Sequence, residues 1–368
     1  MCEQHKRKDS SGIGARTIPV NEAVGTVLAH DITEIRPGEF KGRAFKKGHV
    51  VREEDINHLQ KLGKENLYIL EVKEDEMHED DASYAIAGAL AGKGVKISGE
   101  PKEGKINLVA AHDGMLKVNR EALLEFNMLA EVSCATIHNN SIVKKGQIVA
   151  GTRAIPLVVE KALVDSAGKI AGSVSGVLTV KEIRRPMAGV VITGNEVYYG
   201  KVKDAFTPVI TQKIKAFKGE IVGIYYAPDE VGHVENRIRE LVDAGADLII
   251  TTGGMSVDPD DITRFAISNV SEGEVVYGSP VLPGSMFLVA YMNNSKLNSS
   301  IVNRQSSLIP ILGIPACGMY SNITIFDLIL PRVLSGERIG RKELAELGHG
   351  GLCMKCDECR YPVCPFGK

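Results

Sequence analysis

One short stretch of the chain combines glycines and carboxylates in a spacing that suits phosphate and metal chemistry. Residues 246–250 form an apolar run typical of a buried parallel strand, Gly253 and Gly254 follow it, and a helix is predicted over 262–267. Glycines let the backbone approach an anion, and the N-terminus of a helix attracts phosphate. Between the glycines and the helix lie three carboxylates that suit Mg²⁺: Asp258, Asp260 and Asp261. The alternative is a tight turn with a capped helix and no ligand.

Three further loops follow predicted strands in the same way. Thr193-Gly194-Asn195-Glu196 comes after the apolar run 189–192, and the segments 280–284 and 312–318 each contain a proline and glycine. Together with residues 251–261, this ordered set resembles the molybdopterin-binding domain shared by the MogA/MoaB, MoeA (gephyrin E-domain) and CinA families. The resemblance covers residues 185–335.

The predicted fold of this region is α/β. Strands at Val190–Thr193, Ile221–Tyr226 and Leu248–Thr251 alternate with helices, which predicts a parallel sheet with helices on both faces. The resemblance implies the same three-layer α/β/α domain, over residues 185–336. A smaller mixed and β-rich region precedes it, with a mixed α/β part over 15–100 and a small β-rich domain over 101–184.

The resemblance also implies a function in molybdenum cofactor biosynthesis. The implied enzyme is a Mg²⁺-dependent molybdopterin molybdenumtransferase, in which adenylylated molybdopterin takes up molybdate and releases AMP. Asn195, Ala316 and Cys317 depart from the family motifs, and these departures favour a non-catalytic carrier of molybdopterin or molybdenum cofactor, or a redox-sensing delivery protein. A CinA-like nucleotide hydrolase is the third alternative.

The resemblance assigns roles to individual residues. Glu196, Asp229 and Asp261 are the implied catalytic residues, with Glu196 and Asp261 also holding the metal. For Glu196 the alternative is a surface carboxylate, and for Asp229 it is an N-cap of the helix that follows. The implied pterin-binding residues are Thr193, Gly194, Thr252, Gly253, Gly254, Ser256, Pro283, Gly284 and Pro315.

Positively charged residues are sparse around these motifs. Family members often carry a lysine after the proline–glycine turn, where this chain has Ser285 and Met286. Lys201, Lys203 and Arg264 are the candidates to replace it.

Four of the seven cysteines crowd into residues 337–368: Cys353, Cys356, Cys359 and Cys364. Their spacing resembles the bacterial ferredoxin run with one extra residue in the last gap, which favours a [4Fe–4S] cluster. Zn²⁺ and a metal-free, redox-labile segment are the alternatives. Ligands so close in sequence predict a separable metal-binding module.

Composition narrows the class of protein. With 44 basic and 46 acidic residues among 368, the chain has a net charge of −2, which favours neither nucleic acid nor a membrane surface as partner. Residues 1–14 are expected to be a flexible leader without the apolar core of a signal peptide, so we expect a cytoplasmic protein. The expected partners are the pterin substrate and a molybdoenzyme or another cofactor-synthesis protein, and the resemblance implies a homo-oligomer.

Overall fold

The computed structural model describes residues 15–36, 39–70, 72–102, 104–255, 258, 261–293 and 308–368. The predicted leader and four residues of the glycine–carboxylate stretch, Ser256, Val257, Pro259 and Asp260, lie outside these ranges. The chain divides into two compact units, Met1–Lys181 and Glu182–Lys368. Within the described residues, no helix is long and apolar enough to cross a membrane.

The first unit begins with a small core of its own. Two antiparallel pairs surround it: β1 (Ala15–Pro19) with β4 (Asn66–Leu70), and β2 (Ile32–Arg36) with β3 (Phe40–Phe45). The short helices here are η1 (Val20–Glu22), η2 (Glu53–Asp55) and α1 (Ile56–Lys61). Leu59 of α1 is fully buried against Val20 and Leu28, which explains why apolar residues recur at helical spacing in this segment.

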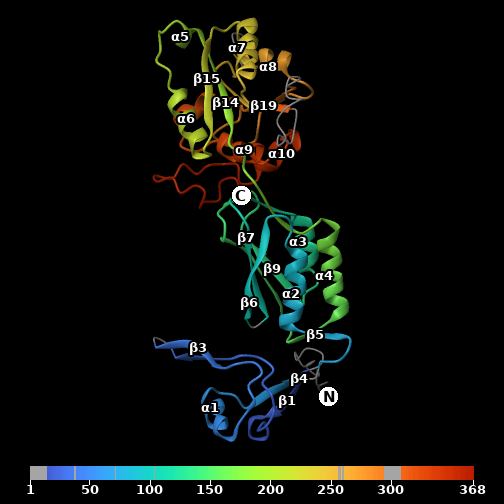
Figure 1. Ribbon diagram of the computed structural model, residues 1–368. Coiled ribbons are helices and arrows are strands. Elements are labelled where there is room, and N and C mark those ends of the chain that lie inside the picture. Colours follow the sequence, from blue (N-terminus) through green and yellow to red (C-terminus); the bar gives the residue numbers. More distant parts are fainter. Residues whose placement is uncertain are drawn as a thin grey trace, which may run out of the picture. The chain divides into compact units, whose positions relative to one another are not determined.

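A larger core in the same unit holds three helices against a four-stranded sheet (Figure 1). The sheet order is β6 (Val95–Lys102), β7 (Lys105–Ala110), β11 (Ile148–Ala154) and β9 (Val132–Thr136), all antiparallel. The helices are α2 (Glu79–Leu90), α3 (Arg120–Asn127) and α4 (Lys161–Ser173). Smaller sheets pair β10 (Ile142–Val143), β8 (Gly114–Val118) and β13 (Leu178–Lys181), and β5 (Glu76–His78) with β12 (Val158–Glu160).

The description of residues 101–184 as β-rich missed two helices, α3 and α4. Helix α4 contains Gly168 and Gly172, which lower its intrinsic helix propensity. Its buried residues Val164, Ala167 and Ala171 nevertheless lie on one face of the helix. Packing of this face therefore outweighs the glycines. Helix α2 belongs to the same core, so the predicted division at residue 100 falls inside it.

The second unit is built around a six-stranded sheet. Its order is β15 (Glu220–Ala227), β14 (Met187–Thr193), β16 (Leu248–Thr252), β19 (Leu308–Ile314), β18 (Leu288–Asn293) and β17 (Val276–Tyr277). The first four strands are parallel, and β18 and β17 continue the sheet in antiparallel pairing. The predicted alternation of strands and helices is thus confirmed.

Helices cover both faces of this sheet, as the three-layer prediction requires (Figure 1). Along β14, Val190 and Ile192 pack on one core and Val191 on the other, because successive side chains of a strand point to opposite faces. One face carries α7 (Val231–Asp243) and α8 (Thr263–Val270), and the other carries α6 (Phe206–Ala216) and α9 (Ile325–Leu334). The remaining helices are α5 (Asn195–Tyr198), η4 (Ala316–Met319), α10 (Arg341–Ala345) and η5 (Glu346–Gly348).

The cysteine-rich segment is an integral part of the second unit. Ile339, Leu344 and Phe366 are buried in the core that α6 and α9 form with the sheet. Leu352 forms a parallel β-bridge with Leu282. The prediction that this segment is a separable module is therefore wrong, because removing it would expose part of that core.

Candidate functional site

A cavity of about 720 Å³ opens at the edge of the sheet where the parallel strands end. The residues directly after β16 and β19 line it, as does the last residue of β14, which places the loops of three neighbouring strands around one space. Ligands of open α/β sheets bind at this edge. Residues of the proline–glycine loop 282–286 and of the cysteine-rich segment complete the wall.

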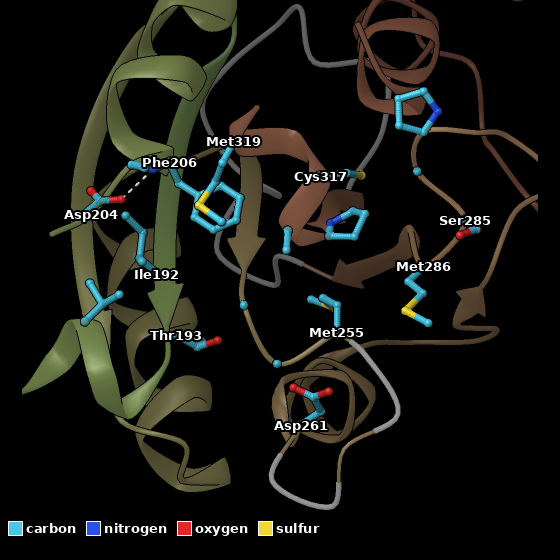
Figure 2. Close-up of a pocket in the computed structure, with 18 of the residues that line it drawn as sticks. Ile192, Thr193, Asp204, Phe206, Met255, Asp261, Ser285, Met286, Cys317 and Met319 are labelled. Atoms are coloured by element: carbon cyan, nitrogen blue, oxygen red, sulfur yellow. Dashed lines mark hydrogen bonds between the residues drawn. The ribbon is translucent and has the colours of Figure 1, made fainter. Parts of the chain in front are cut away.

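Much of the wall is apolar (Figure 2). Phe206 and Met319 lie on one side of the cavity, and Met255 and Met286 lie on another. Methionine side chains adapt to irregular shapes, and flat apolar surfaces suit a planar ring. The cavity thus offers room for a heterocyclic ligand as well as a polar margin.

Thr193 connects the loops at the end of the sheet. Its hydroxyl donates to the carbonyl oxygen of Thr252 at 2.9 Å and lies 2.8 Å from the hydroxyl of Thr263. Since the Thr193 proton is used toward Thr252, the Thr263 hydroxyl donates to Thr193. All three residues are buried. The ends of β14 and β16 and the start of α8 are therefore fixed to one another below the cavity.

Gly253 and Gly254 line the cavity, but glycine is needed at these positions first of all for steric reasons. Both have positive φ, +78° and +54°. A Cβ at Gly253 would overlap the carbonyl oxygen of Thr193, and one at Gly254 would overlap the hydroxyl of Thr263. The glycines thus permit close packing of the strand ends, whether or not their backbone also meets a phosphate.

Two of the carboxylates that line the cavity already accept hydrogen bonds from nearby backbone amides. Asp204 Oδ1 accepts from the amides of Phe206 (2.7 Å) and Thr207 (3.2 Å), at the start of α6. Its other oxygen accepts from the Tyr226 hydroxyl at 3.1 Å. Asp261 accepts from the amide of Asp258 at 3.1 Å, which closes the turn before α8.

Glu196 is the third carboxylate of the cavity. In the described part of the chain, its carboxylate has no hydrogen bond or ion pair, and the residue lines the cavity from α5. Asp229 does not line the cavity: its Oδ2 accepts from the Asn195 amide at 2.9 Å, and Asn195 Oδ1 accepts from the Asp229 amide at 3.3 Å. This reciprocal pair joins the ends of β14 and β15 and gives Asp229 a structural role.

The predicted four-cysteine metal site does not assemble in this structure. Across the ranges that the structure describes, no three His, Cys, Asp or Glu side chains gather as a set of metal ligands. Glu196 and Asp261 both line the cavity, and Mg²⁺ is commonly held by one or two carboxylates together with substrate phosphate. Cys353 and Cys364 are partly buried against the core, whereas Cys356 and Cys359 are exposed. The arrangement does not fit a cluster or a zinc ion held by all four thiolates.

Two cysteines line the cavity, Cys317 from η4 and Cys353 from the cysteine-rich segment. Burial raises the pKa of the Cys317 thiol. The thiol is therefore protonated at neutral pH and is a weak nucleophile.

The cations of the cavity are Lys203 and Lys355. Lys203 was one of the predicted candidates, but Lys355 was not. Arg264 instead stacks over the rings of Phe265 and Tyr277, at 4.9 and 5.7 Å from their centroids.

The structure brings most of the predicted site together. The predicted residues that line the cavity are Thr193, Glu196, Gly253, Gly254, Asp261, Pro283, Gly284, Pro315 and Cys353. Those that do not are Gly194, Thr252, Asp229, Cys356, Cys359 and Cys364. Besides Lys355, sequence reasoning missed Phe206, Met255 and Met319, whose apolar character resembled ordinary core.

Comparison with known families agrees with this geometry. Residues 189–334 match the family described as "Probable molybdopterin binding domain", and residues 17–71 match "Domain of unknown function (DUF8806)". Within the second unit, residues 189–334 are thus similar to a molybdopterin-binding domain, a similarity found for about two fifths of the chain.

Curated relatives share part of the chain. A CinA-like protein of Mycobacterium avium is 35% identical over 94 residues, which are 26% of this chain and 22% of the relative. A CinA-like protein of Mycolicibacterium gilvum is 37% identical over 81 residues, 22% of this chain and 19% of the relative. The chain therefore matches only about a fifth of the length of these relatives.

Two solved structures are similar to part of the chain. The tungsten cofactor synthesizing protein MoaB from Pyrococcus furiosus has a TM-score of 0.33 and 18% identity, and covers 42% of this chain and 99% of its own. The protein CinA from Thermoplasma acidophilum has a TM-score of 0.29 and 11% identity, and covers 36% of this chain and 89% of its own.

Proposed function

We propose that this protein binds molybdopterin in the cavity of its second unit and acts in molybdenum cofactor biosynthesis. The observation that carries the proposal is the meeting of the motif loops after β14, β16 and β19 around one cavity of about 720 Å³. The match of residues 189–334 to a molybdopterin-binding family supports the choice of ligand. The apolar wall would hold the pterin ring, and the polar margin would meet its charged groups.

The finer form of the proposal is molybdenum insertion. In that reaction the two dithiolene sulfurs of adenylylated molybdopterin take up molybdate, and AMP leaves. Glu196 is the pocket carboxylate best suited to a chemical role, because Asp204 and Asp261 already accept hydrogen bonds from backbone amides. It would orient the substrate or accept a proton at its carboxylate oxygen.

A titration and a turnover assay separate binding from catalysis. Purified protein is titrated with molybdopterin by calorimetry, and AMP release from adenylylated molybdopterin is measured with and without molybdate. The proposal predicts saturable binding, and its finer form predicts molybdate-dependent AMP release that Glu196→Gln reduces at least tenfold. Binding without AMP release would indicate a non-catalytic carrier, and absence of binding would refute the proposal. AMP release without molybdate would indicate the CinA-like nucleotide hydrolase.

A matched control for Glu196→Gln is Glu230→Gln. Glu230 is an exposed carboxylate before α7 and does not line the cavity. Its loss should leave AMP release unchanged, since it lies outside the proposed site.

A further inference from the structure

We infer that the cysteine-rich segment is part of the ligand site and that Lys355 binds the anionic group of the ligand. This inference rests on the proposed function, since it takes the phosphate of molybdopterin as that group. The position of the segment against the cavity wall is the first observation. Leu352, Cys353 and Lys355 all line the cavity, although they lie about seventy residues beyond the proline–glycine loop in sequence.

Backbone hydrogen bonds hold the segment in place on that loop. The amide of Leu282 donates to the carbonyl oxygen of Gly351 at 2.8 Å, and the amide of Cys353 donates to the carbonyl oxygen of Leu282 at 2.8 Å. Beyond this bridge, buried Phe366 anchors the end of the segment in the core. The path past the cavity is thus fixed at both ends.

The charges of the cavity point to Lys355 as an anion-binding residue. Lys203 and Lys355 are the cations that line it, and neither has an ion pair among the residues described. Two of the three lining carboxylates already accept hydrogen bonds from backbone amides. A phosphate bound here would therefore meet two ammonium groups that have no ion pair. Lys203 would approach it from the loop before α6, and Lys355 from the cysteine-rich segment.

The local backbone supports a fixed position for this lysine. Lys355 has a φ of +50°, in the left-handed region that residues other than glycine seldom occupy. Non-glycine residues in this region cluster at ligand sites, where the surrounding structure holds them. Ser285 and Met286, which stand where the family resemblance implies a lysine, line the same cavity as Lys355.

Binding titrations with charge variants test the inference. Full-length wild type, Lys355→Met, Lys355→Arg and the control Lys342→Met are titrated with molybdopterin and with pterin that lacks the phosphate. Lys342 lies on α10 and does not line the cavity. Thermal unfolding confirms that each variant is folded.

We expect Lys355→Met to weaken molybdopterin binding about tenfold, as is typical for loss of a charge-assisted hydrogen bond. Lys355→Arg and Lys342→Met should stay within about twofold of wild type, and binding of phosphate-free pterin should not change with any variant. If wild type binds molybdopterin and Lys355→Met binds it equally well, the inference is overturned and the proposed function stands. If wild type binds no molybdopterin, the proposed function fails, and the inference fails with it.

Discussion

The hydroxyl groups of Thr193 and Thr263 lie 2.8 Å apart, between the last residue of β14 and the first residue of α8. Both side chains are buried, and Thr193 also donates to the carbonyl oxygen of Thr252. Two threonines seventy residues apart thus fix the loops from which the cavity is built. The geometry of the site depends on this contact before any ligand is present.

Thr193→Val should therefore destabilise the protein. Valine matches the shape of threonine but leaves the buried Thr263 hydroxyl without its acceptor, which costs about 1–3 kcal/mol. Denaturant unfolding measures this free energy. Thr211→Val is the control, because Thr211 lies on α6 outside this contact. An equal effect of both substitutions would show that the hydroxyl contact has no special importance.

Gly253→Ala should destabilise the fold as well as the site. Alanine is strained at a φ of +78°, and its Cβ would overlap the Thr193 carbonyl oxygen. We expect the free energy of unfolding to fall by more than about 1–3 kcal/mol, because backbone strain alone usually costs that much.

Gly232→Ala provides the control for the glycine prediction. Gly232 lies in α7, and a Cβ there would meet no atom within 4 Å. Alanine in a helix interior is favoured over glycine by about 0.5–1 kcal/mol, so this variant should be as stable as wild type or more stable. Comparable destabilisation by the two substitutions would contradict the steric account.

Truncation after Ser335 should lower the stability of the second unit. It removes three buried apolar side chains, Ile339, Leu344 and Phe366, each of which contributes about 1.5–3 kcal/mol by burial. Thermal unfolding of the truncated and full-length chains measures the effect. The control is Cys356→Ser with Cys359→Ser, since both cysteines are exposed. Should the double variant lose as much stability as the truncation, a metal held by these thiolates would be stabilising the segment instead.

His78 should make the stability of the first unit depend on pH. Burial lowers the pKa of His78, and the nearby Lys47 ammonium lowers it further. Its Nδ1 lies 2.8 Å from Lys47 Nζ, and its Nε2 lies 3.2 Å from the carbonyl oxygen of Ala29. The folded state thus holds a neutral ring, with Lys47 donating to it. The ring contributes stability above its unfolded pKa of about 6.5, and this stability is lost as pH falls toward the lowered folded pKa.

Thermal unfolding of wild type and His78→Gln between about pH 7.5 and 5.5 checks this dependence. The fall in unfolding temperature on acidification should be smaller in the variant. His58→Gln is the control, because His58 is exposed on α1. An identical pH profile for wild type and His78→Gln would contradict the assignment.

The α/β half of the chain could be predicted because its signals are local. Strands β14, β16 and β19 are buried apolar runs followed by glycine or proline, and those residues mark where the cavity lies. In the first unit, helix α4 was not predicted because its glycines lower its helix propensity, and tertiary packing stabilises it. Sequence alone could not show this, because the stabilising contacts come from α2 and the sheet.

The candidate site was predictable in its loops but not in the roles of its charges. Asp229 and Asp261 were each open to interpretation as a ligand or a helix cap. In the structure they accept hydrogen bonds from the amides of Asn195 and Asp258, and the N-cap residues of α7 and α8 are Glu230 and Ile262. Lys355 carried no motif of its own. Its position follows from a backbone bridge between Leu282 and Leu352, and such bridges leave no side-chain signal in the sequence.

Filling the cavity tests most directly the central claim that molybdopterin binds there. Ala316 is exposed and lines the cavity, so Ala316→Trp would occupy the space without disturbing the core. Ala244→Trp, at an exposed alanine after α7, is the control. In calorimetric titrations with molybdopterin, we predict that Ala316→Trp weakens binding at least tenfold while Ala244→Trp binds like wild type. Equal affinities for wild type and Ala316→Trp would contradict the account, because the ligand would then bind outside this cavity.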